Sequence, residues 1–146
     1  MSKTYILEPE VPGGLGPRTQ MDRAVHPPRV QSLHFVFDGW FGDQLVESFP
    51  CYLVTPNLAE SLTAAGVTGF VIAEAEVEAS DQFKEMYPDR SIPPFKWLRV
   101  VGIAGESDIY ITSDNRLAGS QKVVDAVLAT SPSTFEYHEM NPLANQ

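Results

Sequence analysis

The stretch CYLVTPNLAESLTAAGVTGFVIAEAEVEAS (Cys51–Ser80) decides the fold class, because it contains a strand, a helix and a second strand in succession. The apolar run Cys51–Thr55 is typical of a buried strand. Thr55 is a favoured N-cap residue, and Pro56 suits the first turn of a helix because its missing N–H would have no partner there. Gly66 suits the end of that helix, since glycine adopts the left-handed conformation of a C-terminal stop. The sequence therefore predicts a helix over residues 56–65.

The run from residue 69 to 78 is apolar as far as Ala73 and then alternates between acidic and apolar side chains, which predicts a strand with two different faces. One face carries Val71, Ala73, Ala75 and Val77, and the other carries Glu74, Glu76 and Glu78. An acidic strand face has two interpretations. It can protect a sheet edge from aggregation, or it can attract a partner rich in Lys and Arg.

The remaining chain supplies further strands and helices. Period-2 or apolar runs predict strands at residues 5–7, 30–37, 97–105, 108–114 and 134–140, with 97–105 and 108–114 forming a hairpin. Helical spacing and Ser N-caps at Ser80 and Ser120 predict helices at 81–87 and 121–130. We expect an α+β fold, with a mainly antiparallel or mixed sheet and two main helices, 56–65 and 121–130, packed on one side.

The chain length, and a sequence with no linker that would divide it, favour one domain over residues 1–146. Residues 9–30 are rich in Pro and Gly, which exclude a regular helix or a central strand, and we expect a long loop there. Such loops are often functional. Residues 141–146 are expected to form a frayed tail.

Composition excludes several classes of function. The chain is 43% hydrophobic and 20% charged, as expected of a globular protein. A net charge of −9 argues against binding to nucleic acid or to an anionic membrane, and favours a basic protein partner. No stretch approaches the ~18 apolar residues of a membrane span, and no secretory signal opens the chain. One cysteine fits a cytoplasmic protein.

The aromatic and acidic turn after the strand at 30–37 is the main candidate site. Asp38 and Asp43 flank Trp40 and Phe41, with a glycine on each side of the aromatic pair. Aromatic side chains beside acids are typical of protein interfaces. They could also fold back over the core. Two close carboxylates could instead support acid–base catalysis in a cleft around Trp40.

Signals for other chemistry are weak. His26, His34 and His138 lack metal-ligand spacing, so we expect neither a metal nor another cofactor. Cys51 opens an apolar strand, where a thiol is usually buried and inert. No complete catalytic motif is present, although an activated Cys51 remains the alternative nucleophile.

The segments FDGWFGDQLVESFPCYLVTPNLAESLTAAGVTGFVIAEAEVEAS, FKEMYP and PPFKWLRV resemble small acidic bacterial proteins among the immunity proteins of polymorphic toxin systems. The resemblance covers roughly residues 30–101 and rests on a strand, a helix and a following acidic strand. It implies a cytoplasmic protein without enzymatic activity that binds and blocks a toxin. It transfers no catalytic residue, and the 9–30 segment has no counterpart in it.

These observations favour a non-enzymatic protein-binding domain, an immunity-type inhibitor of a basic toxin domain. Its expected partner surface comprises Asp38, Trp40, Phe41, Asp43, Glu74, Glu76 and Glu78. Two alternatives remain open. One is a small hydrolase-like enzyme with a cleft around Trp40, and the other is a structural or regulatory subunit of a bacterial assembly. The oligomeric state is not predicted.

Overall fold

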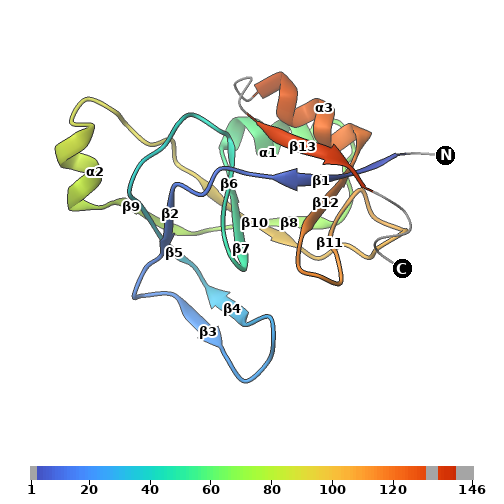
Figure 1. Ribbon diagram of the computed structural model, residues 1–146, viewed down its shortest axis with the longest axis horizontal. Helices are drawn as coiled ribbons and strands as arrows, with labels where there is room; N and C mark the ends of the chain where they lie inside the picture. Colours follow the sequence, from blue (N-terminus) through green and yellow to red (C-terminus); the bar gives the residue numbers. More distant parts are fainter. Residues whose placement is uncertain (1–2, 131–134, 141–146) are drawn as a thin grey trace.

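The computed structural model describes residues 3–130 and 135–140 (Figure 1). Its strands are β1 (Thr4–Glu8), β2 (Gly13–Leu15), β3 (Gln20–Asp22), β4 (Arg29–Ser32), β5 (His34–Phe37), β6 (Leu45–Ser48), β7 (Cys51–Val54), β8 (Phe70–Ala73), β9 (Glu76–Ala79), β10 (Lys96–Val100), β11 (Ile109–Ile111), β12 (Leu117–Ser120) and β13 (Glu136–Glu139). Its helices are α1 (Pro56–Ala64), α2 (Asp81–Met86) and α3 (Gln121–Thr130). The expected α+β class is confirmed.

The strands form several sheets and not the one main sheet that was expected. The terminal sheet has the order β11-β12-β1-β13, the central sheet β6-β7-β10-β8, and the small sheet β2-β5-β9, while β3 and β4 form a separate pair. The sequence run 69–78 explains part of this difference. It is interrupted after β8, which pairs with β10, and resumes as β9, which pairs in parallel with β5.

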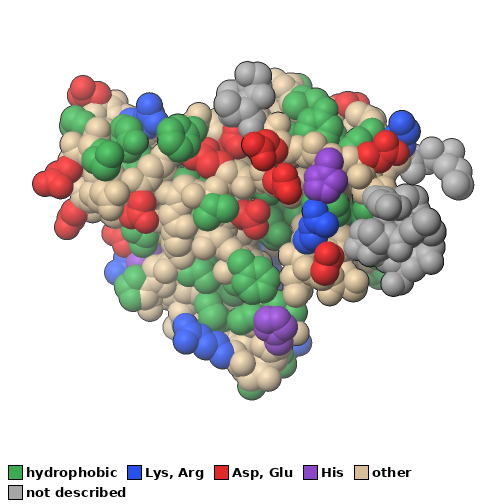
Figure 2. All heavy atoms as spheres, in the orientation of Figure 1, with side chains coloured by type: hydrophobic (Ala, Val, Ile, Leu, Met, Phe, Trp, Pro, Cys, Tyr) green, Lys and Arg blue, Asp and Glu red, His purple; other side chains and the backbone are tan. Residues whose placement is uncertain are grey.

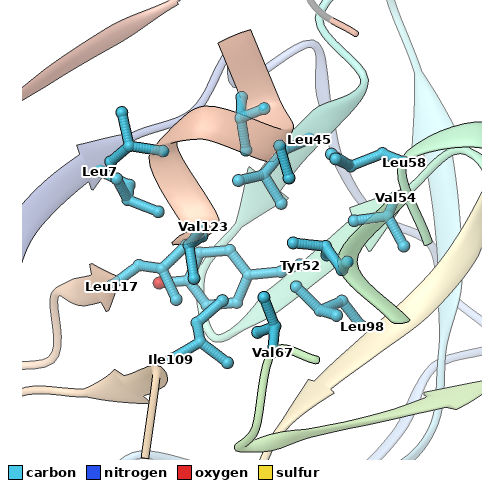
Figure 3. Close-up of a cluster of buried hydrophobic side chains, with 14 of the residues drawn as sticks. Leu7, Leu45, Tyr52, Val54, Leu58, Val67, Leu98, Ile109, Leu117 and Val123 are labelled. Carbon is cyan, nitrogen blue, oxygen red and sulfur yellow. The ribbon is translucent and has the colours of Figure 1, made fainter. Parts of the chain in front are cut away.

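The central sheet carries a hydrophobic core on each face. On β7 all four residues are buried. Tyr52 and Val54 belong to the core beneath the two longer helices (Figure 3), whereas Cys51 and Leu53 face the small sheet and α2. This arrangement follows from strand geometry, because successive side chains point to opposite faces. It explains why the sequence of β7 is apolar at every position.

The two longer helices lie side by side (Figure 1). Helix α1 packs on β7, and α3 packs on β12 and β1. The predicted N-cap at Thr55 is confirmed, since its side chain accepts a hydrogen bond of 3.2 Å from the N–H of Leu58. Ser120 behaves differently from the expected cap. It ends β12, and its hydroxyl donates to Asp108 at 2.9 Å.

Two expected segments need correction. The predicted hairpin between 97–105 and 108–114 is wrong, because β10 and β11 lie in different sheets and β11 pairs with β12. The 9–30 segment contains the short strands β2 and β3, and β4 begins within it. Strand β2 lies at a sheet edge, where its glycines allow close approach: a Cβ on Gly13 would lie 1.9 Å from the carbonyl oxygen of Val36. The expected tail at 141–146 lies outside the described residues.

Within the described part of the chain, no helix combines the length and apolar character that crossing a membrane requires.

Candidate functional site

An acidic hollow lies where the end of β1, the strand β6 and the start of β13 come together. We use this name for a cavity of about 510 Å³ lined by Glu8, Pro9, Glu10, Phe41, Asp43 and Glu136. Figure 2 shows acidic side chains gathered over these elements. Sheet pairing creates the hollow, because Glu8 and Glu136 are directly opposite each other in neighbouring strands and Glu10 forms an isolated bridge with Val46.

The turn after β5 forms one wall of the hollow, and Glu10 holds that turn in place. Its carboxylate accepts hydrogen bonds from the backbone N–H of Phe41 at 2.7 Å and of Asp43 at 3.3 Å. The indole N–H of Trp40 donates to the carbonyl oxygen of Asp43 at 2.8 Å. Gly42 has a φ of 106°, a conformation that glycine adopts readily and other residues avoid. Two side chains therefore fix the turn: Glu10, which precedes it in the sequence, and Trp40, which lies within it.

The predicted aromatic pair splits between core and surface. Trp40 is half-buried, and its ring packs edge-on against Phe95 with centroids 5.8 Å apart. Phe41 is 77% exposed and lines the hollow. Trp40 thus anchors the turn on the core beside the small sheet, while Phe41 leaves a large apolar surface exposed.

The two predicted aspartates also differ. Asp43 is only 5% exposed and lines the hollow, so the turn holds its carboxylate largely away from water. Asp38 is exposed and lies outside the hollow, and its N–H donates to the carbonyl oxygen of Pro12 at 2.8 Å. The two carboxylates therefore sit in different environments.

Burial and like charge raise the pKa of two glutamates around the hollow. Loss of hydration raises the pKa of Glu10, and the neighbouring Asp43 raises it further, whereas the backbone N–H groups of Phe41 and Asp43 oppose the shift. Burial also raises the pKa of Glu47 on β6, with a contribution from the charge of Glu8. Both shifts indicate that negative charge is held here at a cost in free energy.

The strand glutamates form a second acidic region, and their charges are compensated within the chain. Glu74 pairs with Lys96 at 2.9 Å. Arg18 pairs with Glu76, and its Nη2 lies 3.1 Å from Glu78. The side chain of Arg18 lowers the pKa of Glu76 through a hydrogen bond. All three glutamates are exposed, as the alternation predicts, but none lines the acidic hollow.

A buried histidine joins this second region to the small sheet. His34 is 1% exposed, and its Nε2 lies 2.5 Å from a carboxylate oxygen of Glu78. The backbone N–H of Arg18 donates to its Nδ1 at 3.2 Å, and Nη2 of Arg18 lies 3.1 Å from its Nε2. Spacing along the chain did not reveal this contact, because Arg18, His34 and Glu78 come from three separate segments.

Other candidate chemistry has little support in the arrangement of side chains. Cys51 is buried as expected, and burial raises the pKa of its thiol to about 12. A thiol with such a pKa is a poor nucleophile near neutral pH. Among the described residues no group of His, Cys, Asp and Glu is arranged to hold a metal ion. The hollow places the carboxylates of Glu8, Glu10, Asp43 and Glu136 beside the exposed ring of Phe41.

Of the residues that line the hollow, Phe41 and Asp43 were predicted from the sequence, whereas Glu8, Glu10 and Glu136 were not. Those three lie in short polar or Pro-containing segments, and only sheet pairing brings them beside the turn. No protein-family model matches this chain, and neither the search of curated proteins nor that of solved structures gave a significant match. Any assignment of function therefore depends on the geometry of the site.

Proposed function

We propose that this protein is a cytoplasmic binding protein without enzymatic activity, which holds a basic protein partner at the acidic hollow. The partner class that fits the sequence resemblance is a basic toxin domain, which the protein would inhibit as an immunity protein does. The observation that carries the proposal is the pairing of Glu8 with Glu136 on adjacent strands. Like charges directly opposite each other destabilise a sheet, so a partner's cation would relieve a cost that the free protein bears.

The distribution of cations favours the hollow over the strand glutamates as the centre of the interface. Within the described residues, no Lys or Arg lies within ion-pair distance of Glu8, Glu10 or Glu136. The strand glutamates, in contrast, have Lys96, Arg18 and His34 as partners. The negative charge left for a partner is therefore concentrated beside Phe41.

Phe41 supplies the apolar part of the expected interface. An exposed aromatic ring surrounded by charged groups can become an interface anchor when a partner covers it. The guanidinium of a partner's arginine could stack on such a ring while pairing with the carboxylates around it. We therefore expect the partner to present an arginine or lysine at this point.

The test is co-expression with a basic toxin domain encoded beside the gene, followed by binding measurements on the purified pair. We expect growth rescue by the wild type and a loss of about 2 kcal/mol or more in binding free energy for Phe41→Ala, the scale of an interface hot spot. The double variant Glu8→Gln/Glu136→Gln should associate more slowly and with a flatter salt dependence. Its folding stability should hold or rise, because the repulsion between the strands is removed.

The matched control is Glu60→Gln/Glu106→Gln, which makes the same charge change at two exposed positions outside the hollow. The two double variants carry equal net charge, so a slower association of the hollow variant alone assigns the effect to this site. Equal association rates for both, or no protection by the wild type, would refute the proposal.

A further inference from the structure

A second cavity lies beside the small sheet, at the end of the molecule away from the helices α1 and α3. It has a volume of about 400 Å³ and lies between β9, helix α2 and the segment that follows α2. Figure 1 shows α2 and this segment at one end of the molecule, away from α1 and α3. We call it the α2 cavity. Its size falls within the roughly 300–1,000 Å³ of small-molecule sites.

The walls of the α2 cavity are mainly apolar. Val77 and Ala79 contribute from β9, Phe83 and Tyr87 from α2 and its end, and Ile92 from the following segment, together with three prolines. Phe83 is fully buried and packs against Tyr87, with ring centroids 5.6 Å apart. Strand, helix and proline-rich segment thus support these walls from three directions. An occupant would need an apolar body to match them.

Two basic side chains, Lys84 and Arg90, also line the cavity. Within the described residues neither has a carboxylate within ion-pair distance, although the chain as a whole carries a net charge of −9. Arg90 stacks over the ring of Tyr87 at 4.9 Å and donates to the carbonyl oxygen of Trp40. These contacts position its guanidinium, and its charge also lowers the pKa of Glu10 in the acidic hollow from outside ion-pair distance.

The only acidic residue that lines the α2 cavity among those described is Glu78, and its carboxylate is already engaged. One of its oxygens lies 2.5 Å from His34 and 3.1 Å from Arg18, on the other side of β9 from α2. Glu78 therefore does not neutralise Lys84 or Arg90. The cavity combines apolar walls with two cations that, within the described residues, have no carboxylate at ion-pair distance.

We infer that the α2 cavity binds a small organic molecule with an apolar body and one anionic head group, such as a medium-chain carboxylate. The apolar body lies against Val77, Ala79 and Phe83, and the head group lies between Lys84 and Arg90. This inference does not depend on the proposed protein partner, which needs the opposite charge, although Arg90 lies near enough to the acidic hollow to act on Glu10.

The test is calorimetric titration of the full chain with decanoate, and with 1-decanol as the uncharged match. We expect saturable binding of one decanoate and at least fivefold weaker binding of 1-decanol. Lys84→Gln and Arg90→Gln should each weaken decanoate binding about threefold, the scale of an exposed ion pair, and the double variant about tenfold. Amide NMR shifts on titration should be centred on Val77–Ala79 and α2.

Lys122→Gln is the control, because it removes an exposed lysine on α3 far from the cavity and should leave binding unchanged. Ala79→Leu should fill the cavity and abolish binding. If that variant does not fold, the Lys84→Gln/Arg90→Gln pair still decides the question. Absence of decanoate binding, equal affinity for 1-decanol, or binding unaffected by the double variant would each overturn the inference.

Discussion

Gly16 and His34 show how one missing side chain allows a polar cluster to be buried. A Cβ on Gly16 would lie 2.1 Å from Nδ1 of His34 and 2.3 Å from its Cε1. The imidazole cannot move aside easily, because Arg18 contacts both of its nitrogens and Glu78 contacts Nε2. Glycine at position 16 is thus needed for space.

We predict that Gly16→Ala lowers the free energy of unfolding by about 1–3 kcal/mol, the usual cost of overpacking. Gly14→Ala is the matched control, since no atom lies within 4 Å of its added Cβ. That control should change stability by less than about 0.5 kcal/mol. Urea unfolding of both variants measures the difference. Similar values for the two would mean that the His34 cluster adapts without cost.

At the residue scale, the sequence revealed local chemistry better than distant contacts. The turn at residues 38–43 was predictable, because Asp-Gly and a second glycine have known turn preferences. Burial of Cys51 was predictable from its apolar strand. Burial of His34 was not, since it depends on Arg18 and Glu78, which reach it only after β5 and β9 have paired.

Helix α1 is the element whose sequence determines its structure most directly. Its start at Thr55 and Pro56 was predicted, and Leu58 and Leu62 are buried on the face that contacts the core. Helical side chains four residues apart share a face, so periodicity alone identifies the buried positions.

We predict that Leu62→Ala lowers the free energy of unfolding by about 2–5 kcal/mol, because it leaves a cavity in the core beneath α1 and α3. Glu60→Ala is exposed on the same helix and should change it by less than about 0.5 kcal/mol. Chemical denaturation followed by circular dichroism gives both values. A loss at Leu62 as small as that at Glu60 would place the buried face elsewhere.

Strand partners were much harder to predict than strands. Residues 70–73 are uniformly apolar and the alternation begins only at Glu74. Both patterns are typical of strands, so they do not by themselves assign β8 and β9 to different sheets. The chain segment between β10 and β11 is short, and for this reason the sequence predicted a hairpin there. Strand β10 instead pairs with β7 and β8, and β11 pairs with β12.

At the scale of the whole molecule, positive and negative charge are unevenly paired. Lys96 and Arg18 form ion pairs with the strand glutamates, whereas the acidic hollow concentrates carboxylates and the α2 cavity contains two cations. A net charge of −9 alone predicted a basic partner but not where it would bind. Only the fold separates compensated acids from those available for binding.

This uneven pairing predicts a pH dependence of folding stability that can be assigned to Glu10. Its pKa is raised in the folded state, so the folded chain holds this proton at higher pH than the unfolded chain does. The stability contributed by Glu10 is therefore complete below its unfolded pKa of about 4.5 and is lost as pH rises through the folded pKa. Wild-type stability should accordingly fall relative to Glu10→Gln as pH rises above about 4.5, and the gap should then become constant.

Asp108 provides a control of opposite sign. Burial raises its pKa, but hydrogen bonds from Thr68 and Ser120 outweigh that effect, and the net pKa is lowered. Its contribution is therefore present above the unfolded pKa of about 3.8 and lost as pH falls through the folded value. Wild-type stability should rise relative to Asp108→Asn as pH rises through that lower window. Urea unfolding of the three proteins from pH 3 to 7.5 tests both trends. If the difference in free energy of unfolding between wild type and Glu10→Gln stays constant above pH 4.5, or changes in favour of wild type, then the hollow imposes no charge penalty on Glu10.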